Sequence, residues 1–302
     1  MLRKIFASSV LKYNKFMKIK GFFFRHKILL FLSTILLLWL VVYLCLVIIF
    51  RPSHDRDWEL GHEQLPQFIY STDSSMVTIN NYRNFNWTDV KAAEVNYESR
   101  TFDFDNISGV DVFISHFDDF EGLAHIFLSF RVEDDEPVVV SLETRREEGE
   151  AFSPLLGILR QFETIYVVGS EKDIVGVRTG YRGERVYLYP TKATSEQAKE
   201  LLRLISKKVN DVYETPTMYN TLTHNCTNEL TRPVEQMSQV DFPLTWKTIL
   251  PGYFDEVLYE MELIESGGEF PAIKFRHLID NTRVNVQSAD YSDQLRASIA
   301  NI

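Results

Sequence analysis

The hydrophobic positions divide the chain into two unequal parts. Residues 28–50 form an uncharged, mostly apolar run of 23 residues, which exceeds the ~20 residues that a helix needs to cross a hydrocarbon core. Beyond residue 66, apolar positions come in short runs separated by polar turns, as in a folded domain. The pattern therefore predicts one membrane-spanning helix over 28–50, followed by a folded domain over 67–280.

Within the domain, a pair of strand-like runs gives the clearest signal. Residues 124–132 and 137–144 are rich in β-forming side chains, and the acidic turn 133–136 separates them, which predicts antiparallel pairing. Residues 195–213 have the capping residues and the apolar spacing of an amphipathic helix. We further expect a helix over 226–239 kinked by Pro233, a short helix over 153–162, and strands over 110–114, 163–168 and 185–189. These elements predict a mixed α+β fold.

Three polar segments flank the two apolar parts. Residues 1–27 are basic, residues 51–66 are polar and bounded by prolines, and residues 281–302 are polar. We interpret them as a cytoplasmic segment, a tether and a C-terminal tail.

Charge gives the expected direction of insertion. Residues 1–27 hold eight Lys and Arg and no Asp or Glu, and the positive-inside bias places such a segment in the cytoplasm. The folded body is then outside, in the periplasm of a bacterium or in a eukaryotic lumen. A cleaved signal peptide is the alternative, but its apolar region is shorter and ends in small residues, whereas this run ends in Val-Ile-Ile-Phe-Arg-Pro.

The charge of the body excludes one class of partner. Residues 51–302 carry 24 Lys and Arg against 42 Asp and Glu, a net charge of −18. Nucleic acids need a basic face to neutralise their phosphates, so we expect no nucleic-acid partner. The sequence also lacks the short motifs of metal and nucleotide sites, and we expect no cofactor.

Cysteine usage indicates a candidate nucleophile. Cys45 lies in the apolar run, which leaves Cys226 as the one thiol after residue 50, in a compartment that oxidises thiols. Asn225 is a good helix cap, so Cys226 falls in the first helical turn, where the helix dipole lowers the pKa of a thiol. We expect a reactive thiolate; a small buried hydrophobic residue is the alternative interpretation.

A thiol nucleophile needs a base, normally a histidine. His125 starts the first strand of the predicted pair, and antiparallel pairing places it opposite Glu143 or Thr144, where a carboxylate could orient the imidazole. His116 competes for the role of base, and a metal site built from His116 and His125 is a distant third interpretation. Arg145 could bind a phosphate or carboxylate, or could lie in a solvated strand exit.

A set of motifs in a fixed order carries a resemblance. The motifs are HIFLSF at 125–130, VSLETRRE at 140–147, IYVVGSEKD at 165–173, VYLYP at 186–190 and YNTLTHNCT at 219–227. Together they resemble the periplasmic domain family found at the N-terminus of Lnb-type bacterial lipoprotein N-acyltransferases. The order of histidine strand, polar strand and Asn-Cys helix also resembles circularly permuted members of the papain-like superfamily.

The resemblance implies a function and a set of site residues. Cys226 would be the nucleophile, His125 the general base and Glu143 the third member, with Asn225, Arg145 and Tyr219 as candidates for substrate binding. The implied chemistry is acyl transfer through a thioester, to water or another acceptor, at a bacterial inner membrane with phospholipid or lipoprotein acyl groups as substrate. A peptidoglycan amidase or peptidase and a non-catalytic envelope-binding module are the alternatives.

Overall fold

The computed structural model describes the backbone of residues 2–300 and the side chains of residues 26–299. The chain forms two compact units, Met1–Arg51 and Pro52–Ile302. The basic side chains before residue 26, on which the orientation prediction depends, and residues 301–302 of the expected tail lie outside this description.

The first unit is a single helix, α1 (Leu2–Ile49). Its part from His26 to Ile49 is long and apolar enough to span a membrane, with a mean hydropathy of 2.9. The apolar side chains of this part are mostly exposed, as expected for a helix whose partner is lipid rather than protein. The predicted apolar helix is thus present, and the helix extends further toward the N-terminus than the apolar run does.

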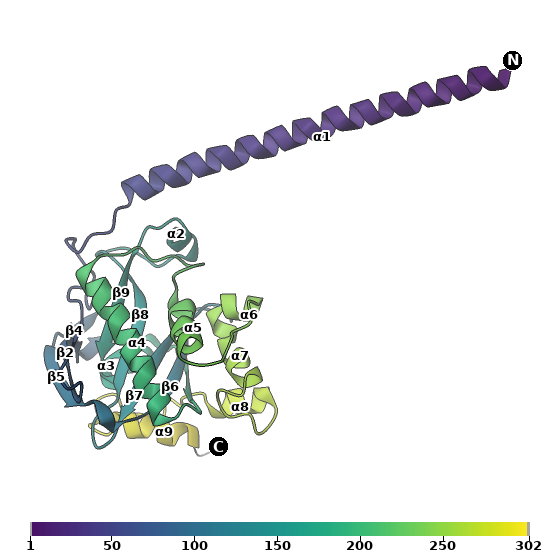
Figure 1. The fold of residues 1–302 in the computed structure, drawn as a ribbon. Coiled ribbons are helices and arrows are strands. Elements are labelled where there is room, and N and C mark those ends of the chain that lie inside the picture. The colour runs from purple at the N-terminus through teal and green to yellow at the C-terminus, as the bar shows by residue number, and fades with distance from the viewer. Residues whose placement is uncertain (1, 301–302) are drawn as a thin grey trace. The chain divides into compact units, whose positions relative to one another are not determined.

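The second unit is built on an eight-stranded sheet. Seven strands follow the order β1-β2-β9-β8-β7-β6-β10, and β5 pairs with β2 (Figure 1). Its strands are β1 (Gln67–Tyr70), β2 (Met76–Arg83), β5 (Tyr97–Asp103), β6 (Ile107–His116), β7 (Ala124–Val132), β8 (Val138–Arg145), β9 (Glu163–Gly169) and β10 (Arg185–Pro190). All neighbouring pairs are antiparallel except β2 and β9. A separate hairpin joins β3 (Asn86–Asp89) and β4 (Ala92–Glu94). The mixed α+β prediction is confirmed.

The helices of the second unit are short, with two exceptions. The long ones are α4 (Ser195–Glu214) and α5 (Cys226–Met237). The others are α2 (Pro154–Ile158), α3 (Glu171–Ile174), α6 (Trp246–Ile249), α7 (Phe254–Glu260), α8 (Phe270–Arg276) and α9 (Tyr291–Ala300). Single 3₁₀ turns form η1 (Phe104–Asn106) and η3 (Pro251–Tyr253), and η2 (Val177–Arg182) is a short π-helix. Helix α4 confirms the amphipathic prediction, and its capping box of Thr194 and Gln197 explains where it begins.

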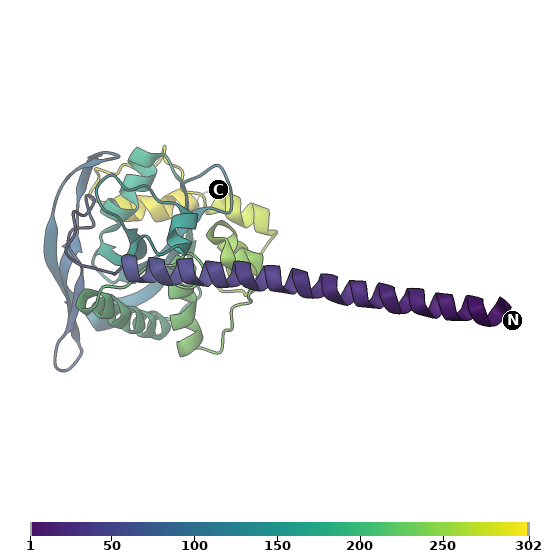
Figure 2. The same cartoon turned by 90° about the horizontal axis from the view of Figure 1, so that it is seen from above.

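Strand alternation gives the sheet two covered faces. Even-numbered residues of β7 and β8, such as Ile126 and Leu142, pack with α4 and α5 in one core cluster. Odd-numbered residues, such as Phe127 and Val139, pack with α9 in another. Figure 2 shows the green helices α4 and α5 and the yellow C-terminal helix on opposite sides of the sheet.

The strands β7 and β8 separate at one end. Their paired residues run from Phe130–Val138 to Leu128–Val140 and stop there. On the outer sides pairing continues, from β7 to β6 as far as Ala124 and from β8 to β9 as far as Arg145. The two strands therefore form a fork within the sheet, and the candidate site lies in it.

Two polar segments, the expected tail over 281–302 and the expected tether over 51–66, are more closely attached to the domain than their composition indicated. The expected tail contains α9, in which Tyr291 and Leu295 are buried against the sheet. The expected tether, from Ser53 to Leu65, bonds to the domain at both of these residues and between them, for instance through Glu59 N–H to the Arg146 carbonyl. Both segments are polar overall, so their composition did not indicate the few residues that attach them to the domain.

Candidate active site

Helix α5 places Cys226 in its first turn, as predicted. The Asn225 side-chain oxygen accepts a hydrogen bond from Asn228 N–H at 2.9 Å, and its amide group donates to the Thr221 carbonyl at 2.6 Å. Asn225 is therefore a helix cap with both ends of its amide engaged. Its side chain is committed to positioning the cysteine, which makes direct substrate binding by this amide unfavourable.

A cavity of ≈ 480 Å³ opens in the fork between β7 and β8. It brings together five of the six predicted site residues: Cys226, His125, Glu143, Asn225 and Tyr219. Apolar side chains complete much of the wall, among them Leu142, Phe152 and Leu250. Cys226 comes from the helix on the even face, whereas His125 and Glu143 point to the odd face. The fork is what lets side chains from both faces open into one cavity.

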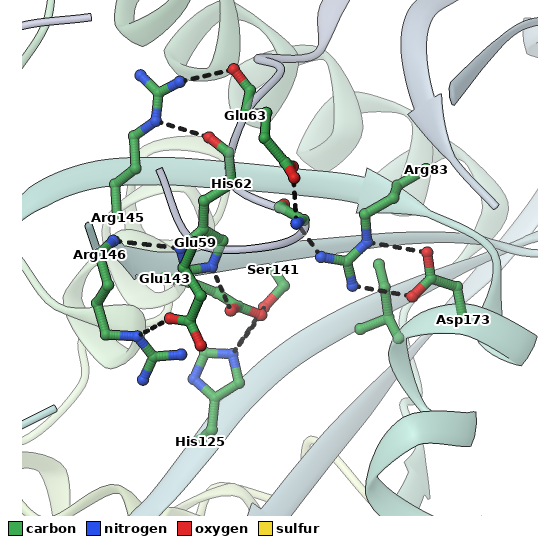
Figure 3. Close-up of polar contacts among 12 residues, drawn as sticks. Glu59, His62, Glu63, Arg83, His125, Ser141, Glu143, Arg145, Arg146 and Asp173 are labelled. Atoms are coloured by element: carbon green, nitrogen blue, oxygen red, sulfur yellow. Dashed lines mark hydrogen bonds and ion pairs between the residues drawn. The ribbon is translucent and has the colours of Figure 1, made fainter. Parts of the chain in front are cut away.

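A polar relay connects His125 to Glu143 (Figure 3). His125 Nε2 lies 2.6 Å from Ser141 Oγ, and Ser141 Oγ donates to Glu143 Oε1 at 2.9 Å. The direct distance from His125 Nε2 to Glu143 Oε1 is 3.7 Å. Ser141 thus stands between the two residues that the sequence analysis expected to touch.

The relay fixes the tautomer of His125. A serine hydroxyl has one proton, and an ionised carboxylate can only accept hydrogen bonds. Since the Ser141 proton is given to Glu143, Ser141 Oγ must accept from His125, which puts the imidazole proton on Nε2. Nδ1 then carries the lone pair and is the nitrogen that can take a proton from a thiol.

Glu143 stays ionised although it is largely removed from solvent. Desolvation alone would raise the pKa of Glu143, but the nearby His62 and the charge of Arg178 outweigh it and hold that pKa well below its ordinary value. Arg178 Nη2 donates to Glu143 Oε1 at 3.1 Å, and His62 Nε2 lies 3.6 Å from the other oxygen. The site therefore holds a permanent negative charge beside the imidazole.

The thiol and the imidazole are both neutral at rest. Burial lowers the pKa of His125 to about 4, against the raising effect of Glu143. Burial likewise raises the pKa of Cys226, against hydrogen bonds from the Ile126 backbone and from the helix start. The expectation of a lowered thiol pKa is wrong, because desolvation of a cysteine only 8% exposed exceeds the effect of the helix N-terminus.

Arg145 lies apart from the cavity and has another role. It is 2% exposed, donates to the carbonyls of His62 and Glu63 at 2.9 and 3.0 Å, and stacks over the Trp58 ring at 4.0 Å. Its guanidinium is occupied by protein groups and lies outside the cavity lining, so the structure does not bring Arg145 together with the other five predicted residues. The arginines that do line the cavity are Arg146, Arg178 and Arg182.

Two other histidines are distinguished by their surroundings. His116 pairs with Ala124 in the β6–β7 ladder while His125 pairs with Ser115, so the two histidines point to opposite faces of the sheet and cannot share a metal ion. His116 does not line the cavity, which favours His125 as the base. His224 faces Glu229 at 3.1 Å. Across the described part of the chain, His, Cys, Asp and Glu form no group able to hold a metal.

Three polar contributors to the site, Ser141, Arg178 and His62, were not among the predicted site residues. Ser141 could have been found, since it precedes Glu143 by two residues and strand alternation puts both on one face. Arg178 follows the acidic residues Glu171 and Asp173, and this charge pattern favours an ion pair within the protein. Arg178 does form an internal ion pair, with Glu143. His62 gave no signal, because it lies 81 residues before Glu143 in a segment that looked like a tether.

Comparison with known proteins gives one match. A family model described as the Lnb N-terminal periplasmic domain matches residues 93–252, more than half of the 302-residue chain. The matched stretch contains Cys226, His125, Ser141 and Glu143 and begins after His62. Comparisons with curated proteins and with solved structures gave no match.

Proposed function

The chain belongs to the family of the Lnb N-terminal periplasmic domain, and from this premise we propose that it is a membrane-anchored, thiol-dependent acyltransferase or hydrolase. One observation carries the proposal. Cys226, at the start of a helix, shares a cavity with His125, and the relay through Ser141 leaves His125 Nδ1 free of its proton. A nucleophile and an oriented base that open into one cavity are the groups that covalent acyl transfer requires.

The proposed reaction starts from the neutral pair. As Cys226 Sγ attacks the carbonyl carbon of an acyl donor, its proton moves to His125 Nδ1, and the imidazolium is stabilised by Glu143 through Ser141. The tetrahedral intermediate collapses to a thioester, and the leaving oxygen or nitrogen takes the proton from His125. Water or another acceptor then attacks the thioester, gives its proton to His125, and releases the thiol, which recovers that proton.

Backbone groups would stabilise the oxyanion. The first N–H groups of a helix have no partner within it, and α5 begins at Cys226. The Ile126 backbone also reaches the sulfur, as its effect on the Cys226 pKa indicates. Its N–H belongs to the part of β7 that has lost its β8 partner. The fork in the sheet thus supplies a donor as well as a cavity.

The cavity favours an acyl substrate. Its volume of ≈ 480 Å³ falls within the range of about 300–1,000 Å³ typical of ligand sites. Its walls are largely apolar, and an anchored protein meets its substrate at high local concentration in the bilayer. We propose phospholipid or lipoprotein acyl groups as substrates. The body would lie in the periplasm and the N-terminus in the cytoplasm, with α1 crossing the inner membrane once.

The proposed fold relationship is to the circularly permuted papain-like enzymes. Its support is the order of the site along the chain: the histidine strand β7 comes first, the polar strand β8 second and the cysteine helix α5 last. The α4 and α5 helices pack on one face of the sheet, and Cys226 belongs to the same core cluster as the even-numbered residues of β7.

A second candidate function rests on the burial of the thiol. Cys226 is 8% exposed, has a raised pKa and belongs to the main core cluster. These are the properties of a packing residue in a non-catalytic binding module. The two candidates differ in whether Cys226 becomes acylated.

The test uses the full chain in lipid nanodiscs with Cys45→Ala, so that Cys226 is the one remaining thiol. The protein is mixed with p-nitrophenyl octanoate, and intact mass and p-nitrophenolate release are recorded. We expect one octanoyl group on Cys226, followed by turnover, and neither in a matched Cys226→Ala variant. Equal release by both proteins, with no mass increase, would leave the binding module as the better account.

A further inference from the structure

The segment Ser53–Leu65, here called the connecting segment, is tied to the end of β8. Glu59 N–H donates to the Arg146 carbonyl at 2.9 Å, and Glu148 N–H donates to the Asp57 carbonyl at 2.9 Å. Trp58 forms a β-bridge with Glu147. These contacts place the segment along the chain just beyond the strand that carries Ser141 and Glu143.

Two buried arginines hold the part of the segment nearest the site (Figure 3). Arg145 donates to the carbonyls of His62 and Glu63, and Arg83 donates to the Gly61 carbonyl at 3.2 Å. Gly61 has φ +86°, in the left-handed region that glycine adopts without strain. Charged donors on consecutive carbonyls leave little freedom to the backbone between them, and His62 is therefore held in a defined place.

The ring of His62 is held between β8 and Glu143. Its Nδ1 accepts a hydrogen bond from Arg146 N–H at 3.2 Å, so the imidazole proton lies on Nε2. Nε2 is 3.6 Å from Glu143 Oε2, and the side chain is 4% exposed. The proton of His62 is thus directed at the carboxylate oxygen that Ser141 and Arg178 do not use.

We propose that the connecting segment completes the active site and that His62 is a positioning residue, which holds Glu143 and, through Ser141, the reactive tautomer of His125. The inference rests on the proposed function, since it assigns a role within that reaction. The segment lies outside the stretch 93–252 that the family match covers. The proposed site would therefore extend beyond the matched stretch, to residues that precede it in the chain.

The chain offers a matched control for this role. His54 lies in the same segment and also contacts Arg145, through Nδ1 to Nη1 at 3.2 Å. Neither His54 nor His62 lines the cavity, but only His62 of the two faces Glu143. Replacing His54 loosens one attachment of the segment and leaves the contact between His62 and Glu143 in place. A purely structural role of the segment predicts similar effects from the two histidines, whereas a positioning role predicts different ones.

The experiment measures octanoyl transfer from p-nitrophenyl octanoate by the full chain carrying Cys45→Ala in nanodiscs. The variants are His62→Ala, His62→Gln and His54→Ala, each checked for folding by thermal unfolding. In His62→Ala we expect kcat to fall about tenfold with KM nearly unchanged, because misplacement of a catalytic group costs rate rather than binding. A glutamine side chain can direct an amide N–H at Glu143, so we expect His62→Gln to regain most of the lost kcat. His54→Ala should retain the parent kcat.

Three results would contradict the proposal. Unchanged kcat in a folded His62→Ala variant would remove His62 from the reaction. Equal losses in the His62→Ala and His54→Ala variants would reduce the segment to a support, as would a folded His62→Gln variant that is no faster than His62→Ala. Failure of the proposed function is seen separately, since the parent protein would then acylate no more than its Cys226→Ala variant.

Discussion

Two carboxylates of the domain, Asp173 and Glu143, are each paired with an arginine and yet differ in their surroundings. Asp173 accepts from Arg83 Nε and Nη2 at 2.9 and 3.0 Å, from Phe85 N–H at 2.9 Å and from Trp87 Nε1 at 2.8 Å. Its side chain is fully buried. Both oxygens of this carboxylate thus accept two hydrogen bonds each, from groups that the fold holds in place.

Glu143 also has four polar contacts, but they are of a different kind. It accepts from Ser141 and Arg178 and faces His62 and His125 at 3.6 and 3.7 Å. Its side chain is 18% exposed and lines the cavity. One of these neighbours, His125, is a side chain that can take up a proton during a reaction, whereas the arginine, indole and backbone N–H groups that bond to Asp173 cannot.

The comparison of the two ion pairs indicates which property distinguishes a carboxylate with a structural role from one with a proposed role in catalysis. An arginine partner is common to both carboxylates, so the ion pair alone does not identify the site. What separates them is a bonded chain leading from Glu143 to a side chain that opens into a cavity. Substitutions at the two carboxylates and along this bonded chain test whether the separation of roles holds.

The largest expected effect is on stability, from Asp173→Asn. The change leaves the buried Arg83 without its counter-charge, which costs about 3–5 kcal/mol of unfolding free energy. Urea unfolding of the full chain measures it, with the exposed Asp135→Asn variant as a control expected to stay within about 0.5 kcal/mol. The folded fraction of Asp173→Asn should keep its kcat. A loss of kcat without a loss of stability would erase the distinction between the two carboxylates.

The next effect is on rate, from Glu143→Gln. Glutamine keeps the size of the side chain but removes the charge that stabilises the His125 imidazolium, so we expect kcat for octanoyl transfer to fall about 100-fold or more. The loss of stability should be smaller than in Asp173→Asn, since solvent in the cavity reaches this group. A folded Glu143→Gln variant with the parent kcat would show that Glu143 is structural too.

Local patterns were enough to predict the elements that carry the site. The acidic turn 133–136 fixed the pairing of β7 with β8, and extending the observed register of Leu128 with Val140 puts His125 level with Glu143. Asn225 was predicted as a cap and is one. These features depend on neighbours in sequence or on one tight turn, which is the range over which sequence patterns are informative.

The failures come from interactions over long sequence distances. No local pattern indicates that β7 and β8 separate, and this fork creates the cavity. The pKa of Cys226 was predicted from its helix position alone, whereas the surrounding core determines its direction. His62 reaches Glu143 only because Arg145 binds the carbonyls of a polar segment. Packing decided each of these outcomes.

A moderate effect is expected from Ser141→Ala, which cuts the relay without removing a charge. His125 and Glu143 would remain 3.7 Å apart, too far for a good hydrogen bond. Losing a hydrogen bond to a charged group typically costs about 1.5–3 kcal/mol, and the low end of this range predicts that kcat falls at least about tenfold. Ser129→Ala is the matched control, because Ser129 lies on the same face and bonds to Glu171. Equal effects of the two changes would argue against the relay.

The smallest expected effect is that of Glu143→Gln on the pKa of the Cys226 thiol in the absence of substrate. It tests whether the charge of Glu143 influences the protonation of Cys226. If Glu143 held His125 protonated at rest, Cys226 would be a thiolate at neutral pH, and Glu143→Gln would raise its pKa strongly. Burial instead lowers the pKa of His125 to about 4 and raises that of Cys226. Iodoacetamide alkylation of the Cys45→Ala chain should therefore accelerate with a midpoint above ~8.5, with little change in Glu143→Gln.

The midpoint of this alkylation profile distinguishes a neutral thiol–imidazole pair from a thiolate–imidazolium pair before the reaction. Above pH 4 His125 is neutral, so the base is already available across the neutral range, and acylation should stay nearly constant as the pH falls from about 8 toward about 5. A midpoint below ~8.5 that rises in Glu143→Gln would instead establish a thiolate–imidazolium pair. The charge of Glu143 would then outweigh desolvation at both groups. With a neutral pair, the carboxylate acts only once the proton has moved, which is why its removal should slow the transfer and leave the resting thiol unchanged.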